Sequence, residues 1–210
     1  MPHVSAVYED ALQELRQRYP WPFDCPKRSF DGHGWFTDQN RRYLADNIDE
    51  FTNVIVELGS WLGLSSRFLL DTAPDATLIC VDHWRGSDHP DCKAMKTEEV
   101  AKRIPTLFEQ FLRNMWNYRE RLIPVRAVTI DGMREIAALG IQPDLVYLDA
   151  DHSYEGTRAE VDAILELFPH ARLVGDDYSN FAGVKKAVDE VAAETGRVLK
   201  FDWNAWQLNP

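Results

Sequence analysis

Acidic residues follow two apolar runs in the second half of the chain, and their spacing suits metal chemistry. Asp149 ends the run that begins at Leu145, and Asp176 and Asp177 follow the run that begins at Arg172. If both runs are parallel strands, their carboxylates meet at one sheet edge and repel one another unless a positive charge lies there. A hard divalent cation supplies that charge, so Asp149, Asp176 and Asp177 are candidate ligands of Mg²⁺. The alternative is that these acids cap a helix or pair with arginine or lysine.

His152 is the candidate general base. It follows Asp149 by three residues, on the loop that leaves the predicted strand. Histidine is the side chain whose unperturbed pKa lies nearest to neutral pH, as a general base requires. We therefore expect His152 and Asp149 to take part in catalysis. The alternative is a histidine with a structural role.

The segment VIVELGSWLGLSS has the pattern of a buried strand, a glycine turn and the start of a helix. We expect Gly59 to let the backbone approach a ligand and Gly63 to let the helix pack near the strand. Ser65 and Ser66 would present hydroxyl and N–H groups to an anion such as a carboxylate. A dinucleotide site would need a glycine where Trp61 stands, which counts against a pyrophosphate ligand. A tight turn without a ligand is the alternative.

Asp82 ends the apolar run that begins at Thr77. In a doubly wound sheet, an acid at the end of the second strand can accept both ribose hydroxyls of a nucleoside. His83 and Trp84 follow, in a position to lie against an adenine face. The alternative is an acid that only caps the strand in solvent. Together with the glycine turn, Asp82 predicts a nucleoside site.

The elements that must position these residues alternate between short β-branched runs and longer amphipathic segments, which is typical of βαβ units. Strands are predicted over 53–58, 77–82, 122–125, 145–149, 172–175, 198–202 and 205–208. Helices are predicted over 65–72, 106–118, 132–139, 155–168 and 183–195, after two leading helices over 7–18 and 41–48. The polar stretch 85–97 is predicted to be a functional loop.

These elements predict an α/β fold with a doubly wound, Rossmann-like, mostly parallel seven-stranded sheet and an N-terminal helical addition. We expect residues 1–50 to form a helical or lid segment and residues 51–210 to form the cofactor-binding domain. The glycine-containing stretch Asp31–Phe36 precedes the core. Its aromatic residues predict either a lid that packs on a substrate or an anchor for the leading helices.

Composition limits the partners of the chain. Its 210 residues carry a formal net charge of −11, which argues against non-specific binding to nucleic acid or to an anionic membrane. The three cysteines, Cys25, Cys80 and Cys92, have neither disulfide-framework nor zinc-site spacing. The N-terminus lacks a signal-peptide pattern, and no apolar run reaches the roughly 20 residues of a membrane span. We expect a reduced, cytoplasmic protein that acts on a small molecule, and the tryptophans near the C-terminus make a homodimer an option.

In the glycine turn, Asp82 and the acidic residues, the chain resembles the class I S-adenosylmethionine-dependent methyltransferases over about residues 50–180. It is most similar to the branch related to small-molecule and sugar O-methyltransferases. The E-L-G-x-x-x-G-x-S pattern at residues 57–65 is similar to that of the metal-dependent catechol-type O-methyltransferases. The resemblance implies that the methionine part of the cofactor is lined by Glu57, Gly59, Ser60, Trp61 and Ser65. It also implies that Asp82 holds the ribose, with His83 beside it.

The rest of the pattern departs from the family in two places. Val128 and Thr129 lie in the family's adenine-side loop, although Ala127 replaces the usual glycine. Asp149 and the pair Asp176 and Asp177 match metal positions of the metal-dependent branch, whereas His152 stands where the catechol type has a catalytic lysine.

The resemblance implies transfer of a methyl group to a small molecule, with a hydroxyl oxygen as the expected acceptor and Mg²⁺ as a candidate assistant. Two alternatives remain at this point. An NAD-type oxidoreductase is disfavoured by Trp61 and by the acidic residues. A nucleoside-binding module without activity is disfavoured because the carboxylates and His152 are all present.

Overall fold

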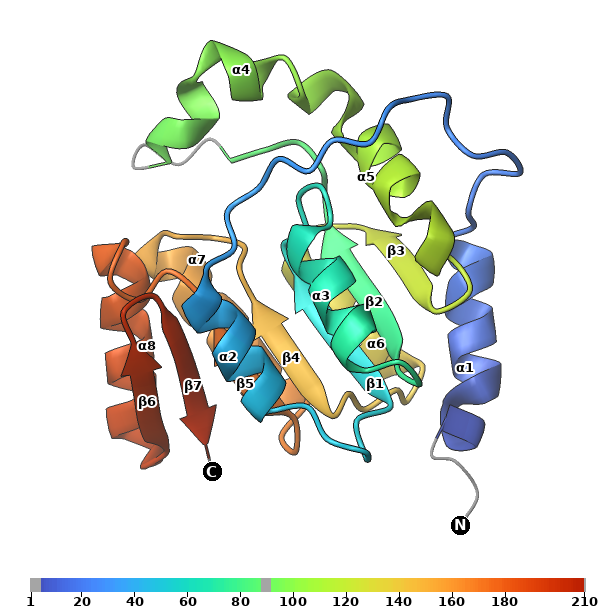
Figure 1. The fold of residues 1–210 in the computed structure, drawn as a ribbon. Coiled ribbons are helices and arrows are strands. Elements are labelled where there is room, and N and C mark those ends of the chain that lie inside the picture. Colours follow the sequence, from blue (N-terminus) through green and yellow to red (C-terminus); the bar gives the residue numbers. More distant parts are fainter. Residues whose placement is uncertain (1–4, 88–91, 210) are drawn as a thin grey trace.

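The computed structural model describes residues 5–87 and 92–209. Its centre is a seven-stranded sheet with the order β3-β2-β1-β4-β5-β7-β6 (Figure 1). The strands are β1 (Val54–Leu58), β2 (Thr77–Asp82), β3 (Leu122–Arg126), β4 (Leu145–Leu148), β5 (Arg172–Gly175), β6 (Val198–Asp202) and β7 (Ala205–Asn209). The strand order reverses between β1 and β4, as in doubly wound folds. The predicted fold class is confirmed.

Strands β1 to β5 are parallel, and β7 pairs antiparallel with both β5 and β6. All five residues of β1 are buried, which explains why its sequence is almost continuously apolar instead of alternating. Because the parallel strands share one direction, the residues that follow β1, β2, β3 and β4 gather at one edge of the sheet, uppermost in Figure 1. At the antiparallel end, Trp206 is fully buried and Trp203 is exposed.

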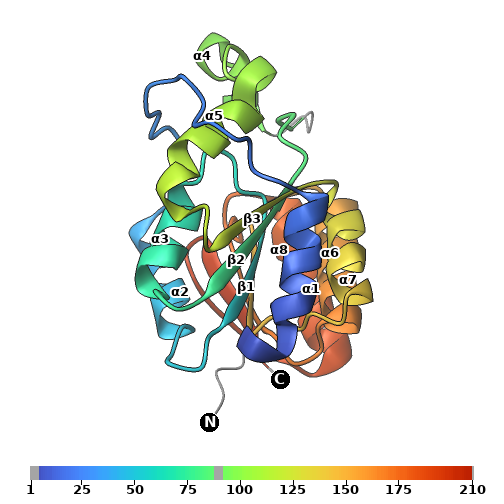
Figure 2. The same cartoon turned by 90° about the vertical axis from the view of Figure 1, so that its right-hand side faces the viewer.

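Helices cover both faces of the sheet (Figure 2). One face carries α1 (Ser5–Arg18), α6 (Thr129–Ala138), α7 (Tyr154–Leu167) and α8 (Ala182–Thr195), and the other carries α2 (Asp38–Asp46), α3 (Leu64–Thr72) and α5 (Leu107–Met115). Leu15 of α1 and Leu44 of α2 are fully buried in the two halves of the core, so the leading helices pack on opposite faces. Helix α2 begins earlier than predicted because Thr37 and Asn40 form a capping box at its start.

Short helical turns lie above the carboxyl edge of the sheet. They are η1 (Lys93–Lys96), α4 (Glu98–Ala101) and η2 (Ile104–Thr106), and η3 (Trp116–Tyr118) follows α5. The prediction of a loop over 85–97 is therefore wrong for its last part, because η1 is helical, and residues 88–91 fall outside the described part of the chain. Within residues 5–87 and 92–209, no helix is long and apolar enough to cross a bilayer.

Candidate functional site

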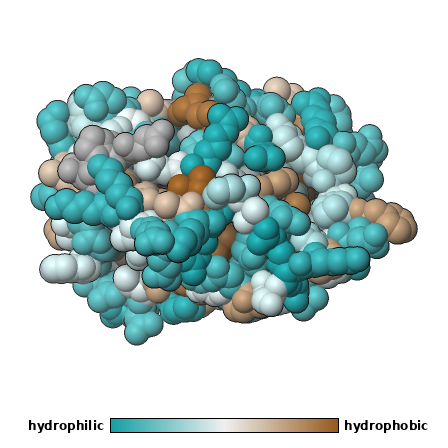
Figure 3. Space-filling view, turned by 90° about the horizontal axis from the view of Figure 1, so that it is seen from above, coloured by the Kyte–Doolittle hydropathy of each residue, from teal (hydrophilic) through white to brown (hydrophobic). Residues whose placement is uncertain are grey.

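The carboxyl ends of β1, β2, β3 and β4 border a cavity of about 540 Å³, a size typical of small-molecule sites. Most residues predicted from the sequence line it: Gly59, Ser60, Trp61, Ser65, Asp82, His83, Val128, Thr129, Asp149 and His152. The predicted residues Glu57, Asp176 and Asp177 do not. Figure 3 looks onto this edge, where hydrophobic side chains show between hydrophilic ones near the middle of the face.

Glu57 lies beneath the cavity and organises the glycine turn. Its side chain is fully buried, and its carboxylate accepts hydrogen bonds from the hydroxyls of Ser60 and Ser65, at 2.6 Å each, and of Ser66. Burial raises the pKa of Glu57, and the three hydroxyls oppose that shift by stabilising the charge. The anion that Ser65 and Ser66 face is therefore a side chain of the protein, which corrects the expectation that they wait for a ligand.

The two glycines of the turn are needed for contacts within the protein. Gly59 has a φ of +84°, and a Cβ there would lie 1.9 Å from the carbonyl oxygen of Asp149. Gly63 has a φ of +85°, and its Cβ would lie 2.5 Å from Sδ of Met115 in α5. The missing side chain of Gly59 thus admits the end of β4, while Gly59 also lines the cavity, so its close approach to a ligand stays a prediction. Similarly, Gly63 admits α5 and not the neighbouring strand.

Asp82 holds the turn from the side of β2. One oxygen, Oδ2, accepts from the backbone N–H groups of Ser60 and Trp61, both at 3.0 Å, and Oδ1 accepts from the N–H of Trp84. Burial raises the pKa of Asp82, and these backbone hydrogen bonds oppose the rise. The carboxylate therefore fixes the turn while it borders the cavity.

The residues after Asp82 have different environments. His83 lines the cavity, as predicted. Trp84 is only 2% exposed, donates from Nε1 to the carbonyl oxygen of Trp61 at 2.9 Å, and packs against Phe108 and Phe111. Trp84 is thus a core residue, and the expectation that it faces adenine is wrong.

Beyond β3, Val128 and Thr129 begin α6 at the wall of the cavity. The Thr129 hydroxyl donates to Oε1 of Glu160 at 2.6 Å. Glu160 is 3% exposed and also lines the cavity, although it belongs to none of the predicted motifs. The signal that could have found it is an acid on the apolar face of α7, four residues before the buried Ile164.

The acidic cluster consists of Asp149, His152 and Asp177, whose potential ligand atoms all lie within 4.8 Å of one another. Nε2 of His152 lies 3.0 Å from Oδ2 of Asp177 and 3.7 Å from Oδ1 of Asp149. Asp176 stands apart from this group. Its carboxylate accepts from the N–H of Asp177 at 2.6 Å and from Asn40, and burial raises its pKa to about 7. The structure thus places His152, and not Asp176, with the other two predicted ligands.

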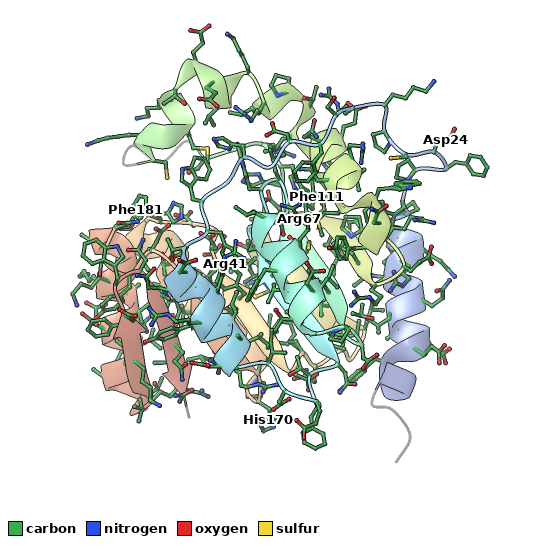
Figure 4. All side chains as sticks on the ribbon, in the orientation of Figure 1. Asp24, Arg41, Arg67, Phe111, His170 and Phe181 are labelled. Atoms are coloured by element: carbon green, nitrogen blue, oxygen red, sulfur yellow. The ribbon has the colours of Figure 1, made fainter. Side chains whose placement is uncertain are left out.

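His152 is held from three sides. Nδ1 lies 3.1 Å from Sγ of Cys92, and the ring stacks on Phe181 at 4.3 Å. Burial alone would lower the pKa of His152, but its contacts with Asp149, Asp177 and Cys92 raise it to about 12. A ring that keeps its proton cannot accept another, so the predicted base role requires Nε2 to lose its proton first. Figure 4 labels Phe181 at this upper edge and His170 at the opposite one, away from the site.

Asp151, two residues after Asp149, has the helix-capping role that was the alternative for the predicted metal ligands. Its carboxylate accepts from the N–H of Ser153 at 2.7 Å, just before α7 begins at Tyr154. A Cβ on Gly156 would lie 2.2 Å from the Asp151 carboxyl carbon, so the carboxylate packs directly on the first turn of the helix. Asp151 thus stabilises the start of α7.

The segment Asp31–Phe36 closes one side of the cavity and also anchors the chain. Trp35 lines the cavity and lies 5.6 Å from the ring of Trp61. Phe36 packs on Phe68, 5.4 Å away, and on Tyr147. The segment is tied above the sheet by the ion pair of Asp31 and Arg103 at 2.8 Å. The contacts of Phe36 fit the anchor interpretation, and the lid role of Trp35 stays a prediction.

Comparison with known proteins points to one family. The model of a methyltransferase domain matches residues 56–178. No curated protein matches the chain.

Three solved structures share the fold at low identity. A Podospora anserina methyltransferase with bound S-adenosylhomocysteine is 12% identical, with a TM-score of 0.54 over 100% of this chain and 97% of that one. A Bacillus cereus O-methyltransferase in complex with the same compound is 15% identical, with a TM-score of 0.51 over 98% and 93%. A TDP-rhamnose 3′-O-methyltransferase of calicheamicin biosynthesis is 14% identical, with a TM-score of 0.53 over 99% and 95%.

The family match extends from the middle of β1 to Tyr178, just after the acidic residues that follow β5, and so covers more than half of the chain. It leaves no support for the oxidoreductase alternative. Since the sheet order and the family agree, the chain belongs to the methyltransferase-domain family and is a class I S-adenosylmethionine-dependent methyltransferase.

Proposed function

We propose that the protein transfers the methyl group of S-adenosylmethionine to a hydroxyl oxygen of a small molecule. One observation carries the proposal: the Gly59 turn, Asp82 and Asp149 border a single cavity. The O-methyltransferases among the structures with the same fold support oxygen as the acceptor, and one of them acts on a sugar nucleotide. S-adenosylmethionine supplies an electrophilic methyl group on a sulfonium.

We propose that the turn and the strand ends divide the cofactor between them. Gly59, Ser60, Trp61 and Ser65 would face the methionine part, with Glu57 positioning them from below. Asp82 and His83 would face the ribose, and Val128 and Thr129 the base. In support, Asp82 already holds the N–H groups of Ser60 and Trp61, so little reorganisation is needed on binding.

We also propose that Asp149, His152 and Asp177 hold a divalent cation. In the described part of the chain, Nε2 of His152 is buried without a well-aligned hydrogen-bond partner, although it faces two carboxylates. Only a neutral imidazole binds a metal, so the cation would replace the proton on Nε2. Two carboxylates and an imidazole suit Mn²⁺, Fe²⁺ or Zn²⁺ better than Mg²⁺, which prefers oxygen ligands. A cation there would lower the pKa of a bound hydroxyl and orient it. Asp176 would then support Asp177 from outside the ligand set.

The residues of the chain would contribute mainly by alignment. Holding the acceptor oxygen in line with the methyl group can lower a barrier by roughly 7–11 kcal/mol in favourable cases. Trp35 and Trp61 line the cavity with their rings 5.6 Å apart, so they would help to exclude water and orient the acceptor. We propose a small-molecule acceptor because the cavity is enclosed on this side by the Asp31–Phe36 segment.

The test measures cofactor binding and turnover separately. Calorimetry with S-adenosylhomocysteine against NAD should show binding of the first compound only. Formation of S-adenosylhomocysteine is then followed with a panel of sugars, phenols and amines, with added Mg²⁺ or Mn²⁺ and with a chelator. Turnover of hydroxylated compounds that the chelator removes supports the whole proposal. Turnover of amines alone would overturn the oxygen acceptor, and full activity in chelator would overturn the cation.

A further inference from the structure

A buried carboxylate outside the residues assigned so far lies at the wall of the cavity. Glu160 projects from the middle of α7, is 3% exposed and lines the cavity together with Thr129. Its Oε1 accepts from the Thr129 hydroxyl at 2.6 Å, and Oε2 accepts from the N–H of Asp151 at 3.4 Å. A carboxylate can accept about four hydrogen bonds, so this one keeps free acceptor positions.

The sheet order indicates which part of a nucleoside would meet Glu160. Asp82 ends β2, which lies between β1 and β3. With ribose on Asp82 and the methionine part on the turn after β1, the base must extend toward the residues after β3. Thr129 is among those residues, and its hydroxyl is bonded to Glu160.

The chemistry of the group then favours one kind of base. An ionised carboxylate only accepts hydrogen bonds. Adenine carries a donor, the 6-amino group, where a 6-oxopurine carries an acceptor oxygen. A buried carboxylate gains from the first and is repelled by the second. Burial raises the pKa of Glu160 to about 7, so a further hydrogen-bond donor would stabilise the charged form.

We propose that Glu160 recognises the 6-amino group of the adenine base and so selects adenosyl over 6-oxopurine cofactors. The inference rests on the proposed placement of the nucleoside but not on the acceptor or the cation. A purely structural Glu160 would only join α6 to α7 through Thr129, and it would not affect the choice of base.

The test compares two ligands on one protein. Dissociation constants for S-adenosylhomocysteine and for its 6-oxo analogue, S-inosylhomocysteine, are measured by calorimetry. The unmodified protein should bind the adenosyl compound about 10 to 100 times more tightly, because the analogue leaves a buried acceptor unpaired. Equal affinities would overturn the proposal without any variant.

Substitution then assigns the preference to this residue. Glu160→Gln adds an amide donor that suits the 6-oxo group, so the preference should fall to within about threefold. Glu166→Gln, on the exposed face of the same helix, is the matched control and should keep the full preference. An unchanged preference in Glu160→Gln overturns the inference. Thermal unfolding shows whether each variant is folded. If Glu160→Gln does not fold, Glu160→Asp is tested instead, and it should also reduce the preference for the adenosyl compound.

A third variant tests the proposed position of the nucleoside, on which the role of Glu160 depends. Asp82→Asn should weaken both compounds by a similar factor, since both carry the same ribose. If Asp82→Asn weakens neither compound, the nucleoside placement fails. If it weakens both while Glu160→Gln keeps the preference, the placement stands and only the assignment of Glu160 fails.

Discussion

Two clusters of polar groups, one buried and one partly buried, lie at the ends of β1 and β4, and they differ in how fully their hydrogen-bonding groups are satisfied. In the Glu57 cluster (Glu57, Ser60, Ser65 and Ser66) three hydroxyls donate to one carboxylate. In the Asp149 cluster (Asp149, His152 and Asp177) two carboxylates share one imidazole, whose Nε2 lacks a well-aligned partner. A satisfied buried charge supports structure, whereas an unsatisfied one is a place where a ligand can bind.

The largest expected effect concerns the Asp149 cluster. Asp177→Ala should lower turnover about 100- to 1000-fold, because the proposed cation loses a ligand. The affinity for S-adenosylhomocysteine should stay within about threefold, because Asp177 does not line the cavity. Single-turnover methyl transfer and calorimetry measure the two quantities. Asp75→Ala, an exposed acid between α3 and β2, is the control. Loss of cofactor affinity in Asp177→Ala would contradict the division between the clusters.

The junction of the clusters should be sensitive to a single methyl group. Gly59→Ala places a Cβ 1.9 Å from the carbonyl oxygen of Asp149, so the free energy of unfolding should fall by about 2–4 kcal/mol. Gly140→Ala is the control: its φ is +75°, but a Cβ there meets no atom within 4 Å. It should cost about 1 kcal/mol, measured by urea unfolding. Equal losses in both variants would show that backbone strain, and not the contact with β4, matters.

Weakening the Glu57 cluster should affect stability and cofactor affinity together. Glu57→Gln leaves at least one hydroxyl without its acceptor, so the free energy of unfolding should fall by about 2 kcal/mol. The affinity for S-adenosylhomocysteine should fall too, since the turn loses its support. Ser66→Ala removes one donor only and should have about half the effect on stability. Normal stability in Glu57→Gln would remove the distinction between the clusters.

The smallest expected change, within one pH unit, is a pH dependence of the stability contributed by the Asp149 cluster. The pKa of His152 is raised to about 12 in the folded protein, so its contribution is complete below pH 6.5 and is lost as the pH rises toward 12. The free energy of unfolding should therefore fall across that range, by at most about 1.4 kcal/mol per pH unit for one proton. His152→Gln should flatten this slope in denaturant unfolding between pH 7 and 9. An identical slope in the variant would contradict the raised pKa.

Sequence reasoning could predict which residues reach the carboxyl edge, because strand ends follow from apolar runs. It could not predict which way each side chain turns there. Asp176 and Asp177 are adjacent, yet Asp177 has a φ of +66° and points to His152, whereas Asp176 meets Asn40. That backbone conformation has no signal in the sequence.

The same limit applies to partners that come from distant segments. The resemblance places Glu57 against the cofactor. The three serine hydroxyls that donate to its carboxylate come together only in the folded turn. The spacing of Cys92 excludes only a disulfide framework and a zinc site, and its contact with His152 spans 60 residues. Glu160 was missed because a single acid in an amphipathic helix is ordinarily a surface residue.

The close contact of Gly59 with the carbonyl oxygen of Asp149 has a consequence for how this enzyme could be altered. The part of the molecule proposed to carry the methyl donor and the part proposed to bind the acceptor meet backbone to backbone, with no side chain between them. The pairing of β4 with β1 would therefore set the distance between the methyl donor and the acceptor. Trp35 lines the cavity but takes no part in this contact, so it is the place to redesign acceptor preference.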